Sequence, residues 1–333
     1  MVGGKVLFAF VKFNFYSWRI SMLQITKYLI LGLFFNQAIA KSPQIAITQI
    51  VAHPSLDQIR QGVLDELVDQ GLIESDLSDI IYQNAQGNIT IAAQIAQRFA
   101  TLKPKIIVAI ATPSAQTMLK AVKNTFLPVV FGAVTDPVDA GLVSRLHNHQ
   151  GFITGTIDLP SPKDQVLLIK KMLPKLHTIG LIYNPAEKNS QKQINAIKEV
   201  AADFGIKVEE AVVFKTADVA QATLYLTDKV EAILLPNDNT AISALETIIK
   251  IATKGKVPVF ASDPESVKNG AVAAVANDQY QVGRETGLIV ANILKGQDIK
   301  NIDVQVIAAN KTYFNEKMIK KFGLTLPLSS ERK

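Results

Sequence analysis

The stretch that decides the fold reads HTIGLIYNPAEKNS and spans residues 177–190. Its apolar run, 179–183, stops at Asn184, and a long helical pattern begins after a polar cluster that contains Glu187, Asn189 and Ser190. A buried strand that ends in a polar turn and opens a helix is the repeating unit of an open α/β sheet. Ligands of such sheets bind just beyond the carboxyl ends of the strands.

The same order of strand, polar turn and helix start occurs at 106–114 (IIVAIATPS), 232–240 (AILLPNDNT) and 257–263 (VPVFASD). These strand ends carry small polar residues and neither Lys nor Arg. Strands that alternate with helices of ten to fifteen residues are typical of a parallel, doubly wound sheet. We therefore predict an α/β protein of two Rossmann-like lobes, joined by hinge crossovers, with a small-molecule site between them.

The first lobe is expected to span 44–157 plus about 277–308, and the second 158–276 plus about 309–327. The pattern predicts first-lobe strands at 44–51, 79–85, 106–111, 128–131 and 152–158, with Ser55 as the N-cap of the first helix. Second-lobe strands are predicted at 178–183, 206–213, 231–235, 257–261 and 271–275. A helix over 280–294 should return to the first lobe, and the segments 303–308 and 315–322 should close the chain. Hinges are expected near Asp158, Asn277 and Ala308.

Charge argues against a nucleic-acid partner. The chain of 333 residues has a formal net charge of +6, but residues 1–40 hold four basic residues and no acid. The rest of the chain therefore carries a net charge of about +2, which is not the clustered basic surface that nucleic-acid binding requires.

The N-terminal segment predicts secretion. From Met22, the expected start of translation, Lys27 precedes a short apolar core at 28–35, and the small-x-small sequence of Ala38 to Ala40 precedes Lys41. This order predicts a cleaved signal peptide within 1–40. An uncleaved membrane anchor is the alternative, but the apolar run is much shorter than the ~20 residues of a spanning helix. The chain has no cysteine, which excludes disulfides, thiol catalysis and a lipid on an N-terminal cysteine. We expect a free periplasmic protein and not a lipoprotein.

Two helix starts are candidates for binding a carboxylate. A helix N-terminus presents unpaired backbone N–H groups and partial positive charge, so it can hold an anion without an Arg. The first candidate start contains Thr112, Pro113 and Ser114, and the second contains Asn184, Asn189 and Ser190. Ordinary helix capping is the alternative interpretation of both.

Acids at strand ends are candidates for binding an ammonium group, which needs an anionic or carbonyl partner when it leaves water. The main candidates are Asp136, Glu187, Asp238 and Asp263, and Asp57, Asp158 and Asp278 have weaker claims. Solvated loop acids or N-caps are the alternative for any one of them. His53, Thr135 and Asn239 lie in the same strand-end segments and complete the candidate site. Four aromatic residues near strand ends are candidates for an apolar pocket, with a place in the core as the alternative for each: Phe131, Tyr183, Phe260 and Tyr280.

No catalytic, cofactor or metal motif stands at a strand end. The four histidines share no metal-ligand spacing, and no G-x-S-x-G, Walker A or G-x-G-x-x-G follows a strand. We therefore predict a binding protein that is not an enzyme and that uses no cofactor and no metal.

Several segments together resemble one family. They are ITQIVAHPSLD (47–57), YQNAQG (82–87), VAIATPSAQ (108–116), FGAVTDPVDAGLV (131–143), YNPAEKNS (183–190), PNDNTAISALE (236–246) and FASD (260–263). In this order they are similar to the tryptophan/tyrosine-type substrate-binding proteins of ABC transporters, over about residues 44–327.

The resemblance implies a type I periplasmic binding-protein fold that traps an amino acid, often tryptophan, tyrosine or phenylalanine, between two lobes. It also implies a monomer that delivers its ligand to an ABC permease and its ATPase. A periplasmic sensor that signals to a membrane partner is the alternative, since the same lobes serve both roles. Other family members often carry Gly where this chain has Asp139.

Overall fold

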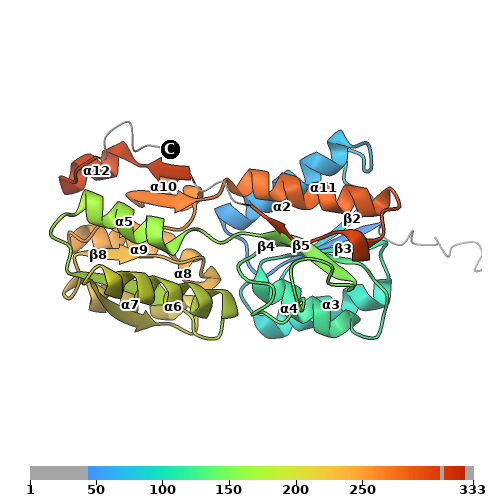
Figure 1. Cartoon of the computed structure of the whole chain (residues 1–333), viewed down its shortest axis with the longest axis horizontal. Helices are drawn as coiled ribbons and strands as arrows, with labels where there is room; N and C mark the ends of the chain where they lie inside the picture. Colours follow the sequence, from blue (N-terminus) through green and yellow to red (C-terminus); the bar gives the residue numbers. More distant parts are fainter. Residues whose placement is uncertain (1–43, 308–310, 327–333) are drawn as a thin grey trace, which may run out of the picture. The chain divides into compact units, whose positions relative to one another are not determined.

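The computed structural model describes residues 44–307 and 311–326 of the chain. Within these ranges the chain forms two α/β lobes, each built around its own sheet (Figure 1). The predicted signal peptide lies outside the described residues. No helix of the described ranges is both long and apolar enough to cross a membrane.

The first lobe is organised around a six-stranded parallel sheet in the order β11-β5-β4-β3-β1-β2. Every residue of β1, β3 and β5 is buried, as expected for parallel strands covered on both faces. The strands are β1 (Ile45–Gln49), β2 (Ile80–Asn84), β3 (Ile106–Ile110), β4 (Val129–Val134), β5 (Ile153–Ile157) and β11 (Gln305–Val306).

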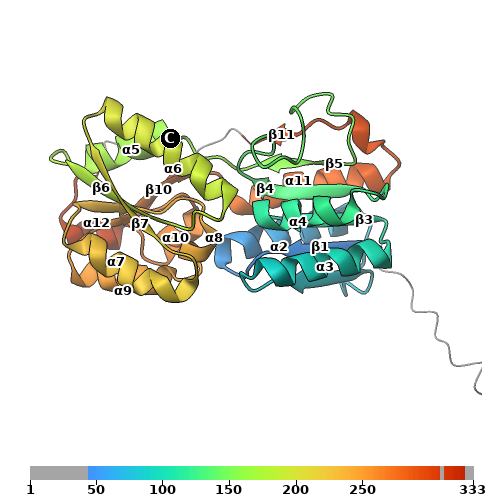
Figure 2. The same ribbon diagram turned by 90° about the horizontal axis from the view of Figure 1, so that it is seen from below.

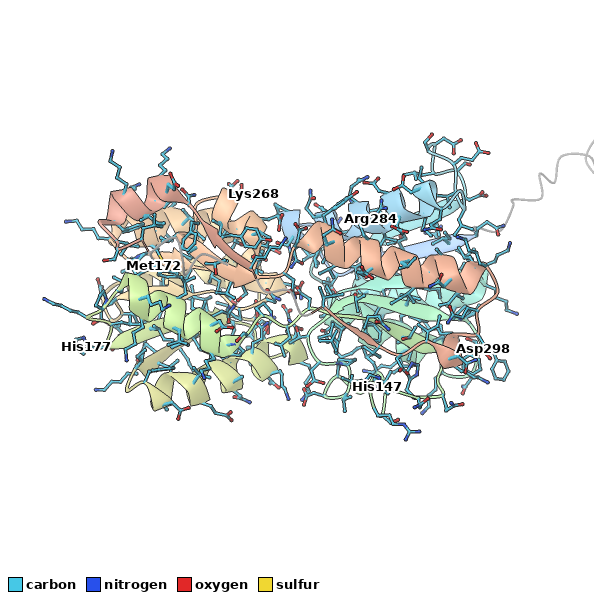
Figure 3. The ribbon with its side chains drawn as sticks, turned by 45° about the horizontal axis from the view of Figure 1, so that its top comes forward. His147, Met172, His177, Lys268, Arg284 and Asp298 are labelled. Atoms are coloured by element: carbon cyan, nitrogen blue, oxygen red, sulfur yellow. The ribbon has the colours of Figure 1, made fainter. Side chains whose placement is uncertain are left out.

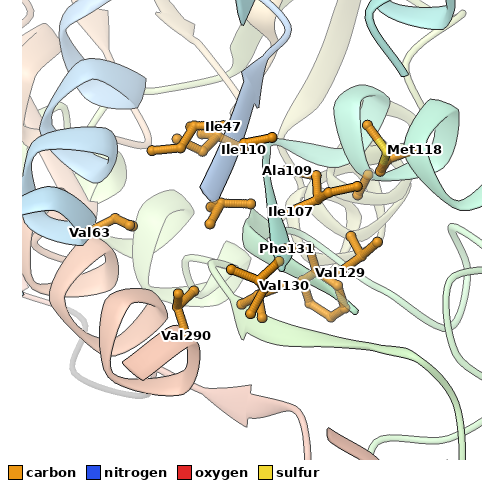
Figure 4. Packing of buried hydrophobic residues seen from close by; sticks show 14 of the residues in the cluster. Ile47, Val63, Ile107, Ala109, Ile110, Met118, Val129, Val130, Phe131 and Val290 are labelled. Carbon is orange, nitrogen blue, oxygen red and sulfur yellow. The ribbon is translucent and has the colours of Figure 1, made fainter. Parts of the chain in front are cut away.

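Helices cover both faces of this sheet (Figures 1 and 2). One face carries α2 (Pro54–Asp69) and α11 (Gln279–Leu294), and the other carries α3 (Ile89–Leu102) and α4 (Thr112–Val122). Figure 4 shows how side chains from β1, β3 and β4, among them Ile47, Ile107 and Phe131, fill the space between sheet and helices.

The second lobe contains the parallel strands β7-β6-β8-β9, and the antiparallel pair β10-β12 joins them through a bridge between Ala261 and Ala274. Two clusters of buried apolar residues, one on each face, form its core. Its strands are β6 (Thr178–Tyr183), β7 (Lys207–Val212), β8 (Ala232–Leu234), β9 (Val259–Phe260), β10 (Ala273–Ala276) and β12 (Lys311–Phe314). Its helices are α5 (Pro162–Met172), α6 (Lys188–Asp203), α7 (Val219–Thr227), α8 (Asn239–Ile242), α9 (Leu245–Lys254), α10 (Pro264–Lys268) and α12 (Glu316–Phe322), and short 3₁₀ turns are η1 (Thr216–Asp218) and, in the first lobe, η2 (Ile299–Asn301).

The chain crosses between the sheets three times: after β5, after β10 and between β11 and β12. After the second crossing, α11 packs so closely on α2 that a Cβ at Gly62 would lie 2.2 Å from the backbone oxygen of Tyr280. A Cβ at Gly283 would likewise lie 2.2 Å from the backbone oxygen of Ile59. Two glycines therefore allow the returning helix to seat against the first lobe.

Two local predictions were wrong. The predicted parallel character of the sheets fails at β12, a strand that the pattern missed and that runs antiparallel to β10. In the predicted closing segment 303–308, strand β11 occupies Gln305–Val306, and Ala308 lies outside the described residues. The N-cap of α2 is His53, not Ser55, because Pro54 occupies the first helical turn and the His53 side chain accepts a hydrogen bond from the Leu56 N–H.

Candidate functional site

A pocket lies beyond the carboxyl ends of strands from both sheets. Its empty volume is about 390 Å³, which includes its opening to solvent. The pocket lining contains six residues of the predicted site: His53, Thr112, Thr135, Asn189, Asn239 and Asp263. Parallel strands place their carboxyl ends at one edge of a sheet, so residues distant in the sequence meet there. No Lys or Arg lines the pocket.

The first-lobe side of the pocket includes the start of α4. Ala111, the N-cap, has a φ of 71° and makes no side-chain capping hydrogen bond, so the first turn keeps backbone N–H groups that no cap satisfies. The Thr112 hydroxyl beside them is buried and has no partner among the described residues. This helix start can therefore offer hydrogen-bond donors to an anionic group.

A bulge in β4 shapes the same side. The register between β4 and β5 shifts between Phe131 and Val134, and within the shift Ala133 has a φ of 56° and lines the pocket. Bulges redirect side chains next to binding sites, and non-glycine residues at positive φ store strain on the order of 1–3 kcal/mol each. Ala111 and Ala133 are two such residues on one wall of the pocket.

One of the two ring nitrogens of His53 has no hydrogen-bond partner among the described residues. Its Nδ1 accepts from the Leu56 N–H at 3.5 Å, while its Nε2 is buried and bonded to no described residue. Burial lowers the pKa of His53, although Asp263 and other nearby groups act in the opposite direction. A neutral ring whose Nδ1 accepts carries its proton on Nε2, so His53 is a hydrogen-bond donor at the pocket wall.

On the second-lobe side, Glu187 organises a buried polar network. Its Oε2 accepts from the Asn189 side chain at 3.2 Å and from the backbone and side-chain nitrogens of Asn239 at 3.1 and 2.6 Å. Its Oε1 accepts from the backbone and hydroxyl of Thr240 at 3.1 and 2.8 Å. Five donors hold one carboxylate, and this carboxylate in turn orients Asn189 and Asn239 at the pocket.

Asp238 lies behind this network and does not line the pocket. It accepts from the Asn184 N–H and the Ser190 hydroxyl, both at 2.6 Å, and caps α8 through the Ala241 N–H. Burial and the neighbouring Glu187 raise the pKa of Asp238 to about 8. The acid is therefore largely protonated at neutral pH.

Two acids line the pocket itself. Asp263 caps α10 and accepts a hydrogen bond from Ser55 of the first lobe at 2.6 Å. Asp158, at the first crossover, accepts from three side-chain amides, and burial raises its pKa. These carboxylates, together with the start of α4 and the Thr112 hydroxyl, can bind a molecule that carries both charges.

The remaining predicted site residues lie elsewhere. Pro113 and Asn184 line a wider groove beside the pocket, and Glu187 and Asn239 also border it. Ser114 and Ser190 are fully buried. Asp136 lies near the surface, 3.1 Å from the Lys192 ammonium. Its partial burial acts to raise its pKa, but hydrogen bonds from the Asp139 N–H and from Lys192 outweigh this effect and lower the pKa.

None of the four aromatic candidates lines the pocket. Phe131 and Phe260 belong to the two lobe cores, while the hydroxyls of Tyr183 and Tyr280 bind Glu210 and Asp65. The apolar part of the lining comes from Leu56, Ala111, Ala133 and Ile242. Two of the four histidines, His147 and His177, are exposed far from any strand-end site (Figure 3).

The sequence interpretation missed Ser55, Asn237 and Gln279 and gave Asp158 too little weight. All four line the pocket. Asn237 stands in the strand-end stretch 232–240, and Gln279 follows the predicted hinge at Asn277, so both positions carried a signal. Among the described residues no cluster of three or more acidic, histidine or cysteine side chains has the arrangement of a metal site.

The comparison with known proteins decides the family. Residues 44–330 match the family model described as ABC transporter substrate binding protein. The chain belongs to this family. A tyrosine-binding protein of Clostridioides difficile (strain R20291) is 35% identical over 284 residues, which cover 85% of this chain and 82% of that protein. This substrate-binding protein has the type I periplasmic binding-protein fold.

Two solved structures are similar to this chain over most of its length. The crystal structure of an ABC domain in complex with L-Trp from Streptococcus pneumonia is 34% identical, with a TM-score of 0.81, and the match covers 86% of this chain and 96% of that one. The ligand-free, open structure of a substrate-binding protein from Clostridium difficile is 36% identical, with a TM-score of 0.64, over 86% and 97%. At similar identity and coverage, the TM-score is higher for the structure that contains L-Trp.

Proposed function

We propose that this substrate-binding protein is the extracytoplasmic receptor of an ABC importer and that it captures an aromatic amino acid between its lobes. One observation carries the proposal: the pocket combines an uncapped helix start on one wall with two buried carboxylates, and neither Lys nor Arg lines it. The names of the two relatives that bind tyrosine and L-Trp support the choice of an aromatic amino acid.

In this proposal the ligand carboxylate binds at the start of α4, where backbone N–H groups, Thr112 and the Nε2–H of His53 donate to it. The ammonium group binds a carboxylate of the pocket lining. Because both lobes contribute, the ligand stabilises the lobe arrangement that contacts it from both sides and shifts the population toward that arrangement. Hinges near Asp158 and Asn277, and near Ala308, which lies outside the described residues, would carry the motion, with lobes divided as the sequence predicts.

The finer parts of the function follow from the same proposal. The protein acts as a periplasmic monomer, freed from its signal peptide, and passes the ligand to a permease and its ATPase without chemical change. The site holds no cofactor in its working form.

Calorimetric titration of the purified protein with L-tyrosine, L-tryptophan and L-phenylalanine tests the proposal. We expect saturable binding of at least one of them with one site per chain and no product by mass spectrometry. Trp18, the sole tryptophan, precedes the expected start at Met22 and lies outside the predicted mature chain, so indole emission from added L-tryptophan gives a second readout. Absence of binding by all three amino acids would refute the aromatic assignment.

A further inference from the structure

Asp158 occupies a position that no other acid of the pocket shares. It follows β5 directly, its backbone N–H donates to the Val134 oxygen at 3.1 Å, and its side chain lines the pocket with 3% of the residue exposed. The first crossover between the lobes therefore begins with a buried carboxylate that faces the ligand site.

The partners of this carboxylate are all neutral. Oδ1 accepts from the Asn277 side chain at 2.9 Å, and Oδ2 accepts from the side chains of Gln279 at 3.0 Å and Asn237 at 3.3 Å. Among the described residues, the charged group that acts on Asp158 is another acid, Asp263. A buried carboxylate without a cation is costly, so this arrangement favours a ligand that brings positive charge.

Two unpartnered oxygens accompany the carboxylate. The Asn189 side chain donates through Nδ2 to Glu187 and to the Asn237 oxygen, which fixes its amide orientation and leaves Oδ1 buried without a described partner at the pocket. Asn277 donates through Nδ2 to Asp158, and its own Oδ1 is likewise buried and unpartnered. An ammonium group has three hydrogens to donate, and the Asp158 carboxylate and these two amide oxygens are all acceptors.

The other acids near the pocket already have strong hydrogen-bond or ion-pair partners. Asp263 holds three short bonds, from the Ser55 hydroxyl at 2.6 Å and from the Ser266 N–H and hydroxyl at 2.7 and 2.6 Å. Glu187 and Asp238 bind donors of their own lobe, and Asp136 pairs with Lys192. Asp158 is thus the acid of the site with the longest bonds and no charged partner.

We propose that Asp158 accepts the α-ammonium group of the ligand and is the residue by which the site distinguishes an amino acid from the same molecule without its amino group. The inference rests on the proposed function. Because its amide partners lie on the second crossover, on α11 and in the loop after β8, the ammonium group is bound where the lobes are joined.

The test compares L-tyrosine with 3-(4-hydroxyphenyl)propionate, its analogue without the amino group, by calorimetric competition. If the wild type prefers L-tryptophan to L-tyrosine, the two probes are L-tryptophan and indole-3-propionate. We expect the wild type to prefer the amino acid by about 100-fold or more, since an unmet buried charge weakens binding strongly. Asp158→Asn should reduce this preference at least about tenfold, while both probes still bind.

Asp203→Asn, which neutralises an exposed acid of α6, is the control, and its preference should stay within about threefold of the wild-type value. Asp263→Asn removes the other acid of the lining and tests the competing assignment. Equal loss of affinity for both probes in Asp158→Asn would indicate a structural role and overturn the proposal. Collapse of the preference in Asp263→Asn alone would assign the ammonium group to Asp263 instead.

Two further measurements keep the proposal open to refutation if Asp158→Asn fails to fold. Asp158→Ser is smaller, and its hydroxyl still accepts a hydrogen bond from the amides, so the same collapse of preference is expected. The wild type alone also tests the proposal: equal affinity for the two probes refutes it. A wild type that binds no amino acid refutes the proposed function, and that outcome differs from binding without discrimination.

Discussion

The two walls of the pocket differ in how many of their polar groups already have hydrogen-bond partners. On the first-lobe wall the Thr112 hydroxyl and His53 Nε2 are buried without described partners, and α4 starts without a side-chain cap. On the second-lobe wall Glu187 alone accepts from five donors. The first wall therefore keeps binding capacity for a ligand, whereas the second has used most of its capacity to hold its own shape.

Backbone strain follows the same division. Ala111 and Ala133, both at positive φ, belong to the first wall. By contrast, the second-lobe residues that line the pocket have no positive φ angle. Strain at a binding surface requires support from elsewhere, and here the buried sheet behind it supplies that support. We therefore expect mutations on the first wall to affect affinity and mutations on the second to affect stability.

The largest expected effect is the loss of the Glu187 carboxylate. Glu187→Ala would leave five donors without their acceptor, so we expect a loss of about 3–5 kcal/mol in the free energy of unfolding, measured by urea denaturation. Glu199→Ala, an exposed acid on α6, is the control and should change stability by less than about 0.5 kcal/mol. A loss below about 1 kcal/mol for Glu187→Ala would show that the network does not hold the second wall.

The next effect concerns pH. The pKa of Asp238 is raised in the folded state, to about 8, so the folded protein binds its proton more tightly than the unfolded chain does. Its contribution to stability is complete below the unfolded pKa of ~4 and is lost as pH rises through about 8. Between pH 5 and pH 8 the wild type should lose on the order of 3 kcal/mol relative to Asp238→Asn, which cannot ionise.

Thermal melting at pH 5, 6.5 and 8 measures this difference, and the comparison with Asp238→Asn cancels the groups common to both proteins. Asp158 also has a raised pKa and contributes with the same sign in both. If the melting temperatures of the two proteins change equally with pH across this range, Asp238 is ionised in the folded protein.

The division between the walls also explains what the sequence could predict. Parallel strands bring their carboxyl ends to one edge, so Thr112, Asn189 and Asp263 could be placed together from strand-end position alone. Strand-end position did not show in which direction a loop side chain points. Asp238 and Ser190 bind each other behind the network, whereas Asn237, the neighbour of Asp238 in the sequence, lines the pocket.

Other misses have different physical causes. The bulge at Ala133 depends on register with β5, which hydrophobic pattern does not encode. Strand β12 is short and half polar, and it forms because β10 offers an unpaired edge. The aromatic candidates were placed by proximity to strand ends, but the inward face of each strand belongs to the core, and Phe131 and Phe260 fill it.

A smaller effect is expected at Thr112. Thr112→Val removes a buried hydroxyl that has no described partner, so stability should stay within about 0.5 kcal/mol of the wild type. Affinity for the amino acid should fall about tenfold, since a hydrogen bond to a charged carboxylate is lost. Thr223→Val is the opposite case: its hydroxyl donates to the Val219 oxygen at 2.7 Å, away from the pocket, so stability should fall and affinity should not. Unchanged affinity in Thr112→Val would remove the hydroxyl from the proposed carboxylate site.

The smallest effect is expected where the lobes meet at the surface. The Lys192 ammonium lies 3.1 Å from Asp136 and joins α6 to the segment after β4, but its side chain is 45% exposed. Exposed ion pairs contribute ~0–1 kcal/mol, so Lys192→Ala should weaken ligand binding by no more than about fivefold. Lys188→Ala removes the same charge from the same helix at an exposed position, so the difference between the two variants isolates the pair. Raising the salt concentration should shrink that difference, because screening acts on exposed charges. A difference above tenfold, or one that salt leaves unchanged, would mean that contact between the lobes at this surface contributes to binding as much as the polar groups of the pocket do.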